Sequence, residues 1–310
     1  MTKTSVVVIG SFNTDMIVRV SRIPKPGETM LGGQFLTAFG GKGANQAIGA
    51  TRAGAKVTFI ARVGQDGYGD KAVESFRREG MVTHYIKRDA ALPSGVALIF
   101  VGENGQNSIA VASGANSALS PADIAQARKS FTKGSICLMQ LETPLKTIQA
   151  SADLASRMGL RVILNPAPAR RLPASLYRQI FILTPNESEA ELLTGVAIKN
   201  IASAKKAARK LLAKGVSTVV MTLGARGALI ADSLGSRLVP GFKVKALDAT
   251  AAGDIFNGAL AVALGEGKQI DNAVRFANAA AAISVTRLGA QPSAPMRHEI
   301  DHFLDAKTFQ

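Results

Sequence analysis

Short runs rich in β-branched residues alternate with longer amphipathic runs along most of the chain. Five apolar runs have the length and composition of buried strands, at residues 5–10, 57–64, 136–141, 161–169 and 217–224. Helical periodicity appears between them, at residues 43–55, 68–80, 144–159 and 203–215, and residues 181–195 read as a short strand that continues into a helix. Strands alternating with helices indicate βαβ units. We therefore expect an α/β fold with a doubly wound, mainly parallel sheet flanked by helices.

Two regions interrupt this alternation. Residues 13–40 show no helical periodicity, and residues 93–116 contain two apolar runs joined by "GENGQ", where Asn104-Gly105 is a typical hairpin turn. We expect these two segments to form a small β-sheet lid within one domain that spans residues 1–310. Residues 258–289 are rich in alanine and predict two closely packed helices.

Composition narrows the class of protein. The chain is 47% hydrophobic and has one cysteine, Cys137, inside the apolar stretch "SICLMQL". This setting favours a buried core residue over a reactive thiol. A lone cysteine allows no internal disulfide, which fits a reducing compartment. The N-terminal apolar run is too short for a signal sequence or a membrane span, so we expect a cytoplasmic protein without a membrane partner.

The formal net charge of +15 raises the question of an anionic partner. The basic residues are scattered, and their densest cluster, residues 205–214, alternates with alanine and leucine at helical spacing. This pattern favours a solvated helix face over a nucleic-acid patch. With three tyrosines, no tryptophan and no RNA-binding signature, we expect no nucleic-acid partner.

Two glycine clusters could bring a ligand close to the backbone. The first, "FGGKGANQA" at residues 39–47, lacks the spacing of a phosphate loop. It also lacks the third glycine of a dinucleotide fingerprint, and we expect no strand to end directly before it. Lys42 and Asn45 would offer polar side chains there, although a tight turn is the alternative. The second, residues 222–227, is either a turn or a nucleotide cradle.

The stretch "DATAAGDIFNGALA", residues 248–261, places an aspartate after a run of tiny residues at the start of a predicted helix. The first N–H groups of a helix are unsatisfied and its dipole is positive there, so a bare helix start is an anion site. Asp254 could stabilise the helix dipole, or it could accept a proton in a phosphoryl transfer. Asn186, Glu187 and Glu189 follow a strand end and suit Mg²⁺ held through waters, or Asn186 is a simple helix cap.

Six stretches together resemble the ribokinase family of ATP-dependent sugar kinases, the PfkB-type carbohydrate kinases: "GGKGANQA", "NPAPAR", "TPNESEAE", "TLGARG", "DATAAGDIFNGALA" and "AAAAISVTRLGAQPS". The resemblance runs from about Val6 to Leu304, with the motifs in the expected order. It implies an α/β core with a β lid, a homodimer clasped through the lids, and transfer of phosphate from ATP to the 5-hydroxyl of D-ribose. A kinase of another sugar or nucleoside is the alternative, and a non-catalytic sugar-binding regulator is a further one.

The resemblance also implies roles for individual residues. Asp254 looks like the general base, beside an anion hole formed by the N–H groups of Ala251, Ala252 and Gly253. The sugar-binding positions, with Asp254, are Asn13, Thr14, Asp15, Gly41, Lys42, Gly43, Ala44, Asn45 and Glu142. The ATP-binding positions, with Gly253 and Asp254, are Asn186, Thr222, Leu223, Gly224, Ala225, Arg226, Gly227 and Asn278.

Two metal ions are implied by the same resemblance. Mg²⁺ would be held through water by Asn186 and Glu189. A monovalent cation, usually K⁺, would lie at Asp248, Thr250, Ser284, Arg287, Gly289 and Ser293, several of them through backbone carbonyls. Three positions depart from the family pattern, namely Ala249, Ala251 and Ile255. We expect the bulk of Ile255 to lie near the phosphates or the cation loop, with activity retained and the rate or cation response altered.

Overall fold

The computed structural model describes residues 3–31, 33–104 and 106–307. Its described part contains a main sheet of nine strands in the order β13-β12-β11-β10-β9-β8-β1-β4-β5. These strands are β1 (Ser5–Ile9), β4 (Lys56–Gly64), β5 (Ile86–Asp89), β8 (Ile136–Met139), β9 (Arg161–Leu164), β10 (Ile182–Leu183), β11 (Thr218–Thr222), β12 (Ala228–Asp232) and β13 (Gly235–Val239). All pairs from β5 to β11 are parallel, so the mainly parallel sheet is confirmed.

The last two strands are antiparallel. A 3₁₀ turn, η3 (Gly224–Arg226), follows β11 directly and sends the chain back without a crossover helix. Gly227 closes this turn at φ 94°, and a Cβ there would lie 2.2 Å from the carbonyl oxygen of Val239. Glycine is therefore required where β12 and the end of β13 meet.

The chain order makes the sheet doubly wound. The sheet begins at β1 in its interior, adds β4 and β5 on one side, and then adds β8 to β11 on the other. Val6 pairs with Val57 of β4 and with Ile136 of β8. The winding direction therefore reverses between β1 and β8, and ligands of such sheets bind outside the carboxyl ends of the strands at this point.

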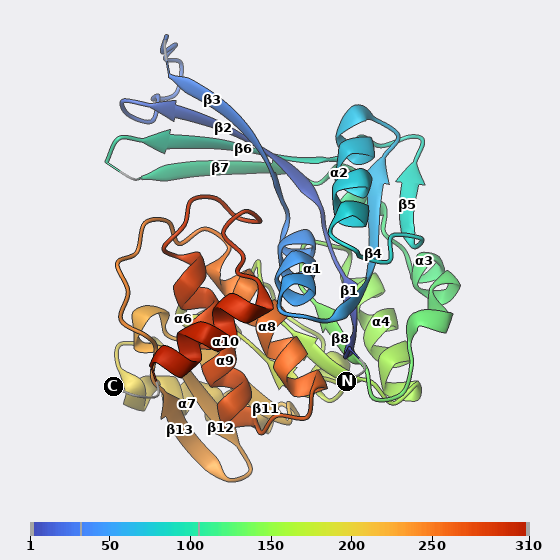
Figure 1. Cartoon of the computed structure of the whole chain (residues 1–310), viewed down its shortest axis with the longest axis vertical. Helices are drawn as coiled ribbons and strands as arrows, with labels where there is room; N and C mark the ends of the chain where they lie inside the picture. The colour runs from blue at the N-terminus through green and yellow to red at the C-terminus, as the bar shows by residue number, and fades with distance from the viewer. Residues whose placement is uncertain (1–2, 32, 105, 308–310) are drawn as a thin grey trace.

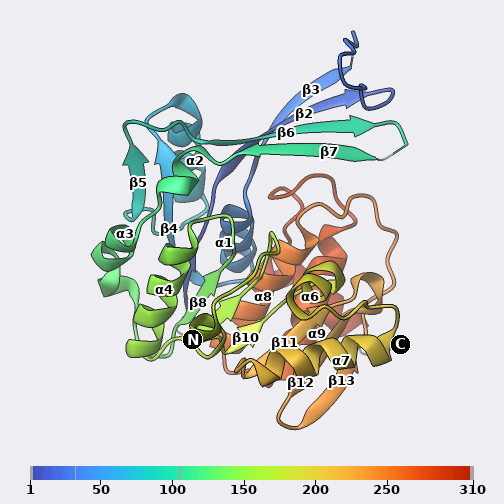
Figure 2. The ribbon, with the colours of Figure 1, turned by 180° about the vertical axis from the view of Figure 1, so that it is seen from behind.

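Helices cover both faces of the main sheet (Figures 1 and 2). One core cluster contains residues of α1 (Lys42–Arg52), α2 (Gly67–Arg78), α8 (Ala252–Gly265), α9 (Ile270–Ser284) and α10 (Arg297–Ala306). The other contains residues of α3 (Pro121–Gln126), α4 (Leu145–Arg157), α5 (Ala174–Tyr177), α6 (Glu187–Thr194) and α7 (Ile201–Ala213). Two further 3₁₀ turns are η1 (Gly114–Ala118) and η2 (Arg128–Ser130).

Two predictions about individual segments are confirmed. Cys137 is fully buried in β8, and burial raises the pKa of its thiol. Helix α7 buries Ala204, Ala207, Ala208 and Leu211 and leaves most of its basic residues exposed, so the 205–214 cluster is a solvated helix face.

The lid is a separate four-stranded sheet in the order β3-β2-β6-β7. Its strands are β2 (Asn13–Val20), β3 (Gln34–Gly40), β6 (Gly95–Gly102) and β7 (Asn107–Ala112), and they lie inside the two segments expected to form it. Figures 1 and 2 show this sheet standing away from the α/β core. Gly105 of the expected Asn-Gly turn lies outside the described residues.

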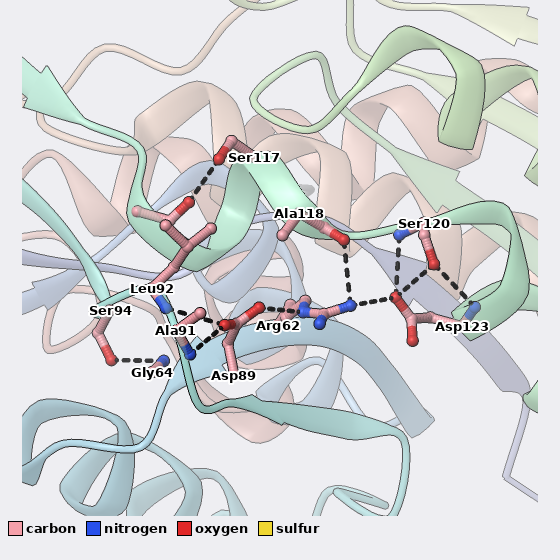
Figure 3. A network of polar contacts seen from close by, with 11 residues as sticks. Arg62, Gly64, Asp89, Ala91, Leu92, Ser94, Ser117, Ala118, Ser120 and Asp123 are labelled. Atoms are coloured by element: carbon pink, nitrogen blue, oxygen red, sulfur yellow. Dashed lines mark hydrogen bonds and ion pairs between the residues drawn. The ribbon is translucent and has the colours of Figure 1, made fainter.

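A polar network fixes the point where the β6–β7 hairpin leaves the core (Figure 3). Arg62 of β4 donates to Asp89 at 2.6 Å, to Asp123 at 3.1 Å and to the carbonyl of Ala118 at 3.2 Å. The hydroxyl of Ser94, just before β6, accepts from the N–H of Gly64 at 3.0 Å. Both ends of the hairpin are therefore tied to β4 and its neighbours.

No helix among the described residues is long and apolar enough to cross a membrane.

Candidate active site

The expected sugar-binding residues gather at the reversal of the sheet, between β1 and β8. Ser11 and Asn13 follow β1, and Glu142 follows β8. The lid strand β3 ends at Gly40, directly before α1, so the expectation that no strand precedes the glycine cluster was wrong. The reason is that β3 belongs to the lid sheet, and its half-exposed sequence lacks the apolar run of a core strand.

Glycines in this cluster allow the start of α1 to press against the β1–β2 connection. Gly41 has φ 87°, and a Cβ on it would lie 2.7 Å from the backbone nitrogen of Asn13. A Cβ on Gly43 would lie 2.5 Å from the nitrogen of Ser11. The N–H of Ala44 donates to the carbonyl of Ser11 at 2.9 Å, which locks the two segments together.

Two carboxylates face this junction. Glu142 accepts from the backbone N–H of Lys42 at 2.9 Å and from the hydroxyl of Ser11. Burial, with the nearby charge of Glu142, raises the pKa of Asp15 to about 6. A sugar hydroxyl is a suitable donor for such closely spaced carboxylate acceptors, because hydrogen bonding to the charged form offsets their mutual repulsion.

A pocket opens on the lid side of these residues. It has a volume of about 390 Å³ and its walls include Asn13, Glu142 and Asn116. Asn116 is 2% exposed and holds the root of the lid, since it donates to the side-chain oxygen of Asn13 at 2.9 Å and to the carbonyl of Phe12 at 2.8 Å. Thr14, another expected contact, is buried, and its hydroxyl has no partner among the described residues.

The start of α8 is as bare as its sequence predicts. Ala251 is the N-cap with φ 59°, the one non-glycine residue with positive φ in the described chain. Gly253 is exposed, and no heavy atom outside its own stretch of the helix lies within 4 Å of the place where its Cβ would be. Within the described residues, the N–H groups of Ala251 and Gly253 have no hydrogen-bond partner, whereas that of Ala252 donates to Ala249 at 3.2 Å. Such a helix start can receive an anion.

Asp254 lies in the first turn of this helix and is 7% exposed. Its carboxylate accepts from the side chains of Asn45 at 3.2 Å and Gln46 at 3.0 Å. Burial raises the pKa of Asp254, while the charge of Lys42 and the two amide hydrogen bonds lower it. In turn, the charge of Asp254 is the largest influence raising the pKa of Lys42, so the ammonium remains protonated beside the carboxylate.

Helix α8 packs closely on α1, which brings Asp254 beside Asn45 and Gln46. A Cβ on Gly258 would lie 2.6 Å from the nitrogen of Ala50 on α1. Ile255 is 1% exposed and packs against Gly49, so its expected place near the phosphates or the cation loop was wrong. Consecutive helical residues point about 100° apart, and when Asp254 faces the site Ile255 faces the α1–α8 contact.

Asn186 and Glu189 form the helix cap that was one of the two interpretations of their sequence. Asn186 accepts from the N–H of Glu189 at 2.8 Å, and Glu189 accepts from the N–H of Asn186 at 2.9 Å. Burial raises the pKa of Glu189, against the hydrogen bond from Asn186 and the charge of Lys42, and the charge of Asp254 raises it further. The carboxylate of Glu189 is therefore close enough to Lys42 and Asp254 for their charges to act on it.

The 222–227 segment is the 3₁₀ turn already described, with Gly224 and Gly227 both at positive φ. Its Arg226 is paired with Glu187 at 2.6 Å. Asn278 of α9 donates to the carbonyls of Val239 at 3.3 Å and Pro240 at 3.2 Å, which ties α9 to the end of β13 beside Gly227. Its side-chain oxygen remains for another partner.

Asp248 organises the loop before α8. It accepts from the N–H and hydroxyl of Thr250 at 2.9 and 2.6 Å and from the N–H of Gly289 at 2.9 Å. These hydrogen bonds outweigh burial and lower its pKa. The hydroxyls of Ser284 and Ser293 donate to carbonyls of their own turns, and Arg287 pairs with Glu299. No cluster of three or more His, Cys, Asp or Glu suited to a metal ion occurs in the described residues.

Sequence reasoning missed a group of buried amides beneath Asp254, namely Gln46, Gln140 and Asn165. Gln46 and Asn165 stand inside stretches that carry the family resemblance, "GGKGANQA" and "NPAPAR". Their position in those stretches was the one sequence signal that could have marked them as functional. Their contact with one another could not be predicted, because it depends on tertiary packing.

Comparisons with known proteins identify relatives along nearly the whole chain. Residues 3–297 match the family described as pfkB family carbohydrate kinase. The chain is 47% identical over 298 residues to a ribokinase from Haemophilus influenzae, covering 96% of this chain and 97% of that protein. It is 37% identical over 300 residues to a deoxyribokinase from Salmonella typhi, covering 96% and 98%.

A solved structure is similar over the same extent. Ribokinase from Arabidopsis thaliana, complexed with ribose and ATP, superposes with a TM-score of 0.90 at 32% identity and covers 98% of this chain and 99% of its own. The fold described above is therefore shared with a solved ribokinase over nearly the whole chain. The chain belongs to the pfkB family of carbohydrate kinases.

Proposed function

We propose that this protein transfers the terminal phosphoryl group of ATP to the 5-hydroxyl of D-ribose, giving ADP and D-ribose 5-phosphate. The observation that carries the proposal is the pairing of buried Asp254 with the open N–H groups of Ala251 and Gly253 on one helix turn. The similarity to ribokinases, one of them solved with ribose and ATP, supports the choice of substrates.

In this proposal Asp254 is the general base. It accepts the proton of the 5-hydroxyl as the oxygen attacks the terminal phosphorus and the bond to the ADP oxygen breaks. The N–H groups of Ala251, Ala252 and Gly253 form the anion hole for the transferring oxygens, with that of Ala252 shared with Ala249. Lys42 adds a protonated ammonium next to the carboxylate.

The sugar would be held between the lid root and the start of α1. Asn13 and Asp15 approach it from β2, the segment Gly41–Asn45 from α1, and Glu142 from the end of β8. The support is that Asn13 and Glu142 line one pocket and that the charge of Glu142 helps to raise the pKa of Asp15. Hydroxyl groups of a sugar can donate to the remaining lone pairs of these carboxylates.

The nucleotide would lie along Asn186, the 222–227 turn and Asn278. Asn186 and Glu189 fit Mg²⁺ because their side chains carry oxygen atoms, the ligands that this ion prefers. Both side chains already form the helix cap, so they would hold the ion through its bound waters. The ion would neutralise charge on the phosphates. The loop of Asp248 and Thr250 fits K⁺ through backbone carbonyls, since the nearby hydroxyls of Ser284 and Ser293 are engaged in their own turns.

We also propose that the protein is a homodimer joined through its lids. Large apolar side chains are exposed on both faces of the lid sheet, and their exposed fractions are 62% for Phe35, 51% for Leu98, 55% for Ile109 and 51% for Val111. Apolar patches of this kind mark interaction surfaces.

An ADP-release assay tests the function. We expect turnover with ribose to exceed that with deoxyribose, fructose and nucleosides, and to rise when K⁺ is added. The deoxyribokinase relative makes deoxyribose the most instructive competitor. Better turnover with another sugar or a nucleoside would reassign the substrate, and ribose binding by calorimetry without phosphate transfer would indicate a regulator.

The matched variant is Asp254→Asn, which keeps the shape of the side chain but cannot accept the proton. We expect kcat to fall on the order of 10²–10⁴-fold. Ribose binding measured by calorimetry should change far less. A near-normal kcat would remove Asp254 from the role of base.

A further inference from the structure

The buried amides of Gln46, Gln140 and Asn165 lie beneath Asp254 and form a chain of hydrogen bonds. Gln46 is 0% exposed, and its Nε2 donates to Asp254 Oδ1 at 3.0 Å and to Asn165 Oδ1 at 3.1 Å. Its Oε1 accepts from Gln140 Nε2 at 2.6 Å. Both N–H groups and the carbonyl of this amide are therefore engaged, and none of them reaches the surface.

The hydrogen-bond chain permits one orientation of the Gln46 amide. Asn165 Nδ2 donates to the backbone carbonyl of Thr184 at 3.0 Å, and a carbonyl can only accept. The oxygen of Asn165 must then face Gln46. A flipped Gln46 would set its own oxygen against two acceptors, Asn165 and the carboxylate of Asp254. The amide consequently presents a donor to Asp254.

The backbone around this chain leaves little room for it to move. A Cβ on Gly10 would lie 2.2 Å from Gln140 Oε1, so the end of β1 touches the outer member of the chain. A Cβ on Gly258 would lie 2.6 Å from the backbone carbonyl oxygen of Gln46, so α8 lies directly against the backbone that carries the inner one. Close packing of this kind holds side chains in single rotamers.

A second branch of the chain reaches the first turn of α8. The hydroxyl of Thr184 donates to Asn257 Oδ1 at 2.6 Å, and Asn257 Nδ2 donates to the carbonyl of Gly253 at 2.7 Å. One continuous set of buried and partly buried hydrogen bonds thus reaches both the carboxylate of Asp254 and the helix turn that carries the open N–H groups.

We propose that Gln46 is a positioning residue, which fixes the carboxylate of Asp254 for proton transfer while Gln140 and Asn165 fix Gln46. The inference rests on the proposed role of Asp254 as base. Asn45, the other partner of Asp254, is also an expected sugar contact, and its hydrogen bonds can change when the sugar arrives. Gln46 is sealed below the site and holds Asp254 throughout.

Gln46 also has an electrostatic effect that can be measured. The charged groups acting on Asp254 are Lys42 of α1, Glu142 after β8 and Glu189 of α6. None of them is changed when Gln46 is replaced by an apolar residue. The hydrogen bond from Gln46 favours the ionised carboxylate, so its loss moves the pKa of Asp254 upward.

The test variant is Gln46→Met, which keeps the volume and removes all three hydrogen bonds. We expect kcat at neutral pH to fall on the order of 10- to 100-fold, the effect of losing a hydrogen bond to a charged group. KM for ribose and ATP should stay within about 3-fold, and the acid limb of the kcat profile should move up by about one pH unit. Gln140→Leu, which frees Gln46 without replacing it, should show smaller changes in the same directions.

Thr147→Val is the matched control. It removes a buried hydroxyl that donates to the carbonyl of Leu119 at 2.6 Å in a part of the chain away from Asp254. We expect it to lower the melting temperature and to leave kcat and its pH profile unchanged. An acid limb that stays in place in both Gln46→Met and Gln140→Leu would overturn the proposal, even if their kcat values fall.

A measurement without turnover separates this proposal from the proposed function. The pKa of Asp254 can be read from ¹³C NMR of labelled aspartate carboxyls, assigned by comparison with Asp254→Asn. A higher pKa in folded Gln46→Met supports the positioning role whether or not ribose is the substrate, and an unchanged pKa contradicts it. Absence of phosphate transfer by the unmodified protein would instead contradict the proposed function alone.

Discussion

Gly258→Ala should damage the active site by pushing helix α8 away from α1. The added Cβ would lie 2.6 Å from the nitrogen of Ala50 and from the carbonyl oxygen of Gln46, which are backbone atoms of α1 and cannot rotate away. Ordinary contact begins at about 3.4 Å, so the two helices must separate by about 0.8 Å. Because the same helix carries Asp254, the strain is transmitted directly to the proposed base.

The separation of the two helices determines how much kcat and the free energy of unfolding should fall. A separation of this size would lengthen the 3.0 Å bond from Gln46 to Asp254 beyond hydrogen-bond range. A misplacement near 1 Å can cost on the order of 10²-fold in rate, so we expect kcat to fall by about 10- to 100-fold. Overpacking costs about 3 kcal/mol at this site and the better helix propensity of alanine returns about 1, which leaves a loss of about 2 kcal/mol.

The assay pairs ADP release with thermal unfolding. An unfolding entropy of about 2.1 cal/mol/K per residue over 310 residues converts the loss into a Tm lower by about 3 °C. Gly67→Ala in α2 is the control, because no heavy atom lies within 4 Å of its added Cβ and it should be neutral or slightly stabilising. A Gly258→Ala protein with unchanged kcat and Tm would refute the account of the α1–α8 contact.

The remaining predictions concern the sugar site, the lid and the core. Since burial raises the pKa of Asp15 to about 6, the carboxyl is protonated below that pH, and ribose binding that needs the ionised form should weaken by about tenfold per pH unit there. Calorimetry between pH 5 and 8 measures this, and Asp15→Asn should remove the dependence. The double variant Leu98→Lys/Ile109→Lys, with one charge on each lid face, should sediment as a monomer, whereas Leu234→Lys on the core should not change the oligomer; a dimer that survives the double change would exclude the lid interface. Arg62→Met should lower the free energy of unfolding by about 3–5 kcal/mol in urea, because it leaves two buried carboxylates without their cation, and a loss below about 1 kcal/mol would contradict that reasoning.

Much of the fold follows from local pattern. Six of the seven parallel strands were predictable because their apolar runs are continuous and separated by amphipathic helices of ordinary length. The seventh, β5, was missed because its sequence IKRD has no apolar run. The antiparallel direction of β12 and the presence of β13 were not expected, since the sequence of a three-residue turn does not show that the chain reverses there. The lid was recognised mainly because its segments lack helical periodicity.

The site was predictable to the extent that it is local in sequence. Asp254 and the bare helix start before it are neighbours along the chain, so their chemistry could be inferred together. The contact between Gln46 and Asp254 spans 208 residues and depends on how closely two glycines let α1 and α8 approach. The same packing explains why Ile255 was misplaced, because sequence gives its neighbours and not the direction of its side chain.

The lid leaves the core immediately after β1 and returns immediately before α1. Its first strand begins at Asn13 and its second ends at Gly40. The expected sugar ligands therefore lie at the start and directly after the end of this β2–β3 segment. Asn13, Thr14 and Asp15 belong to the lid strand β2, whereas the ligands from Lys42 to Asn45 belong to α1, which packs on α8. The two halves of the sugar site would therefore respond differently to any tilt of the lid. A partner that held the lid would change the affinity for the sugar without contacting Asp254.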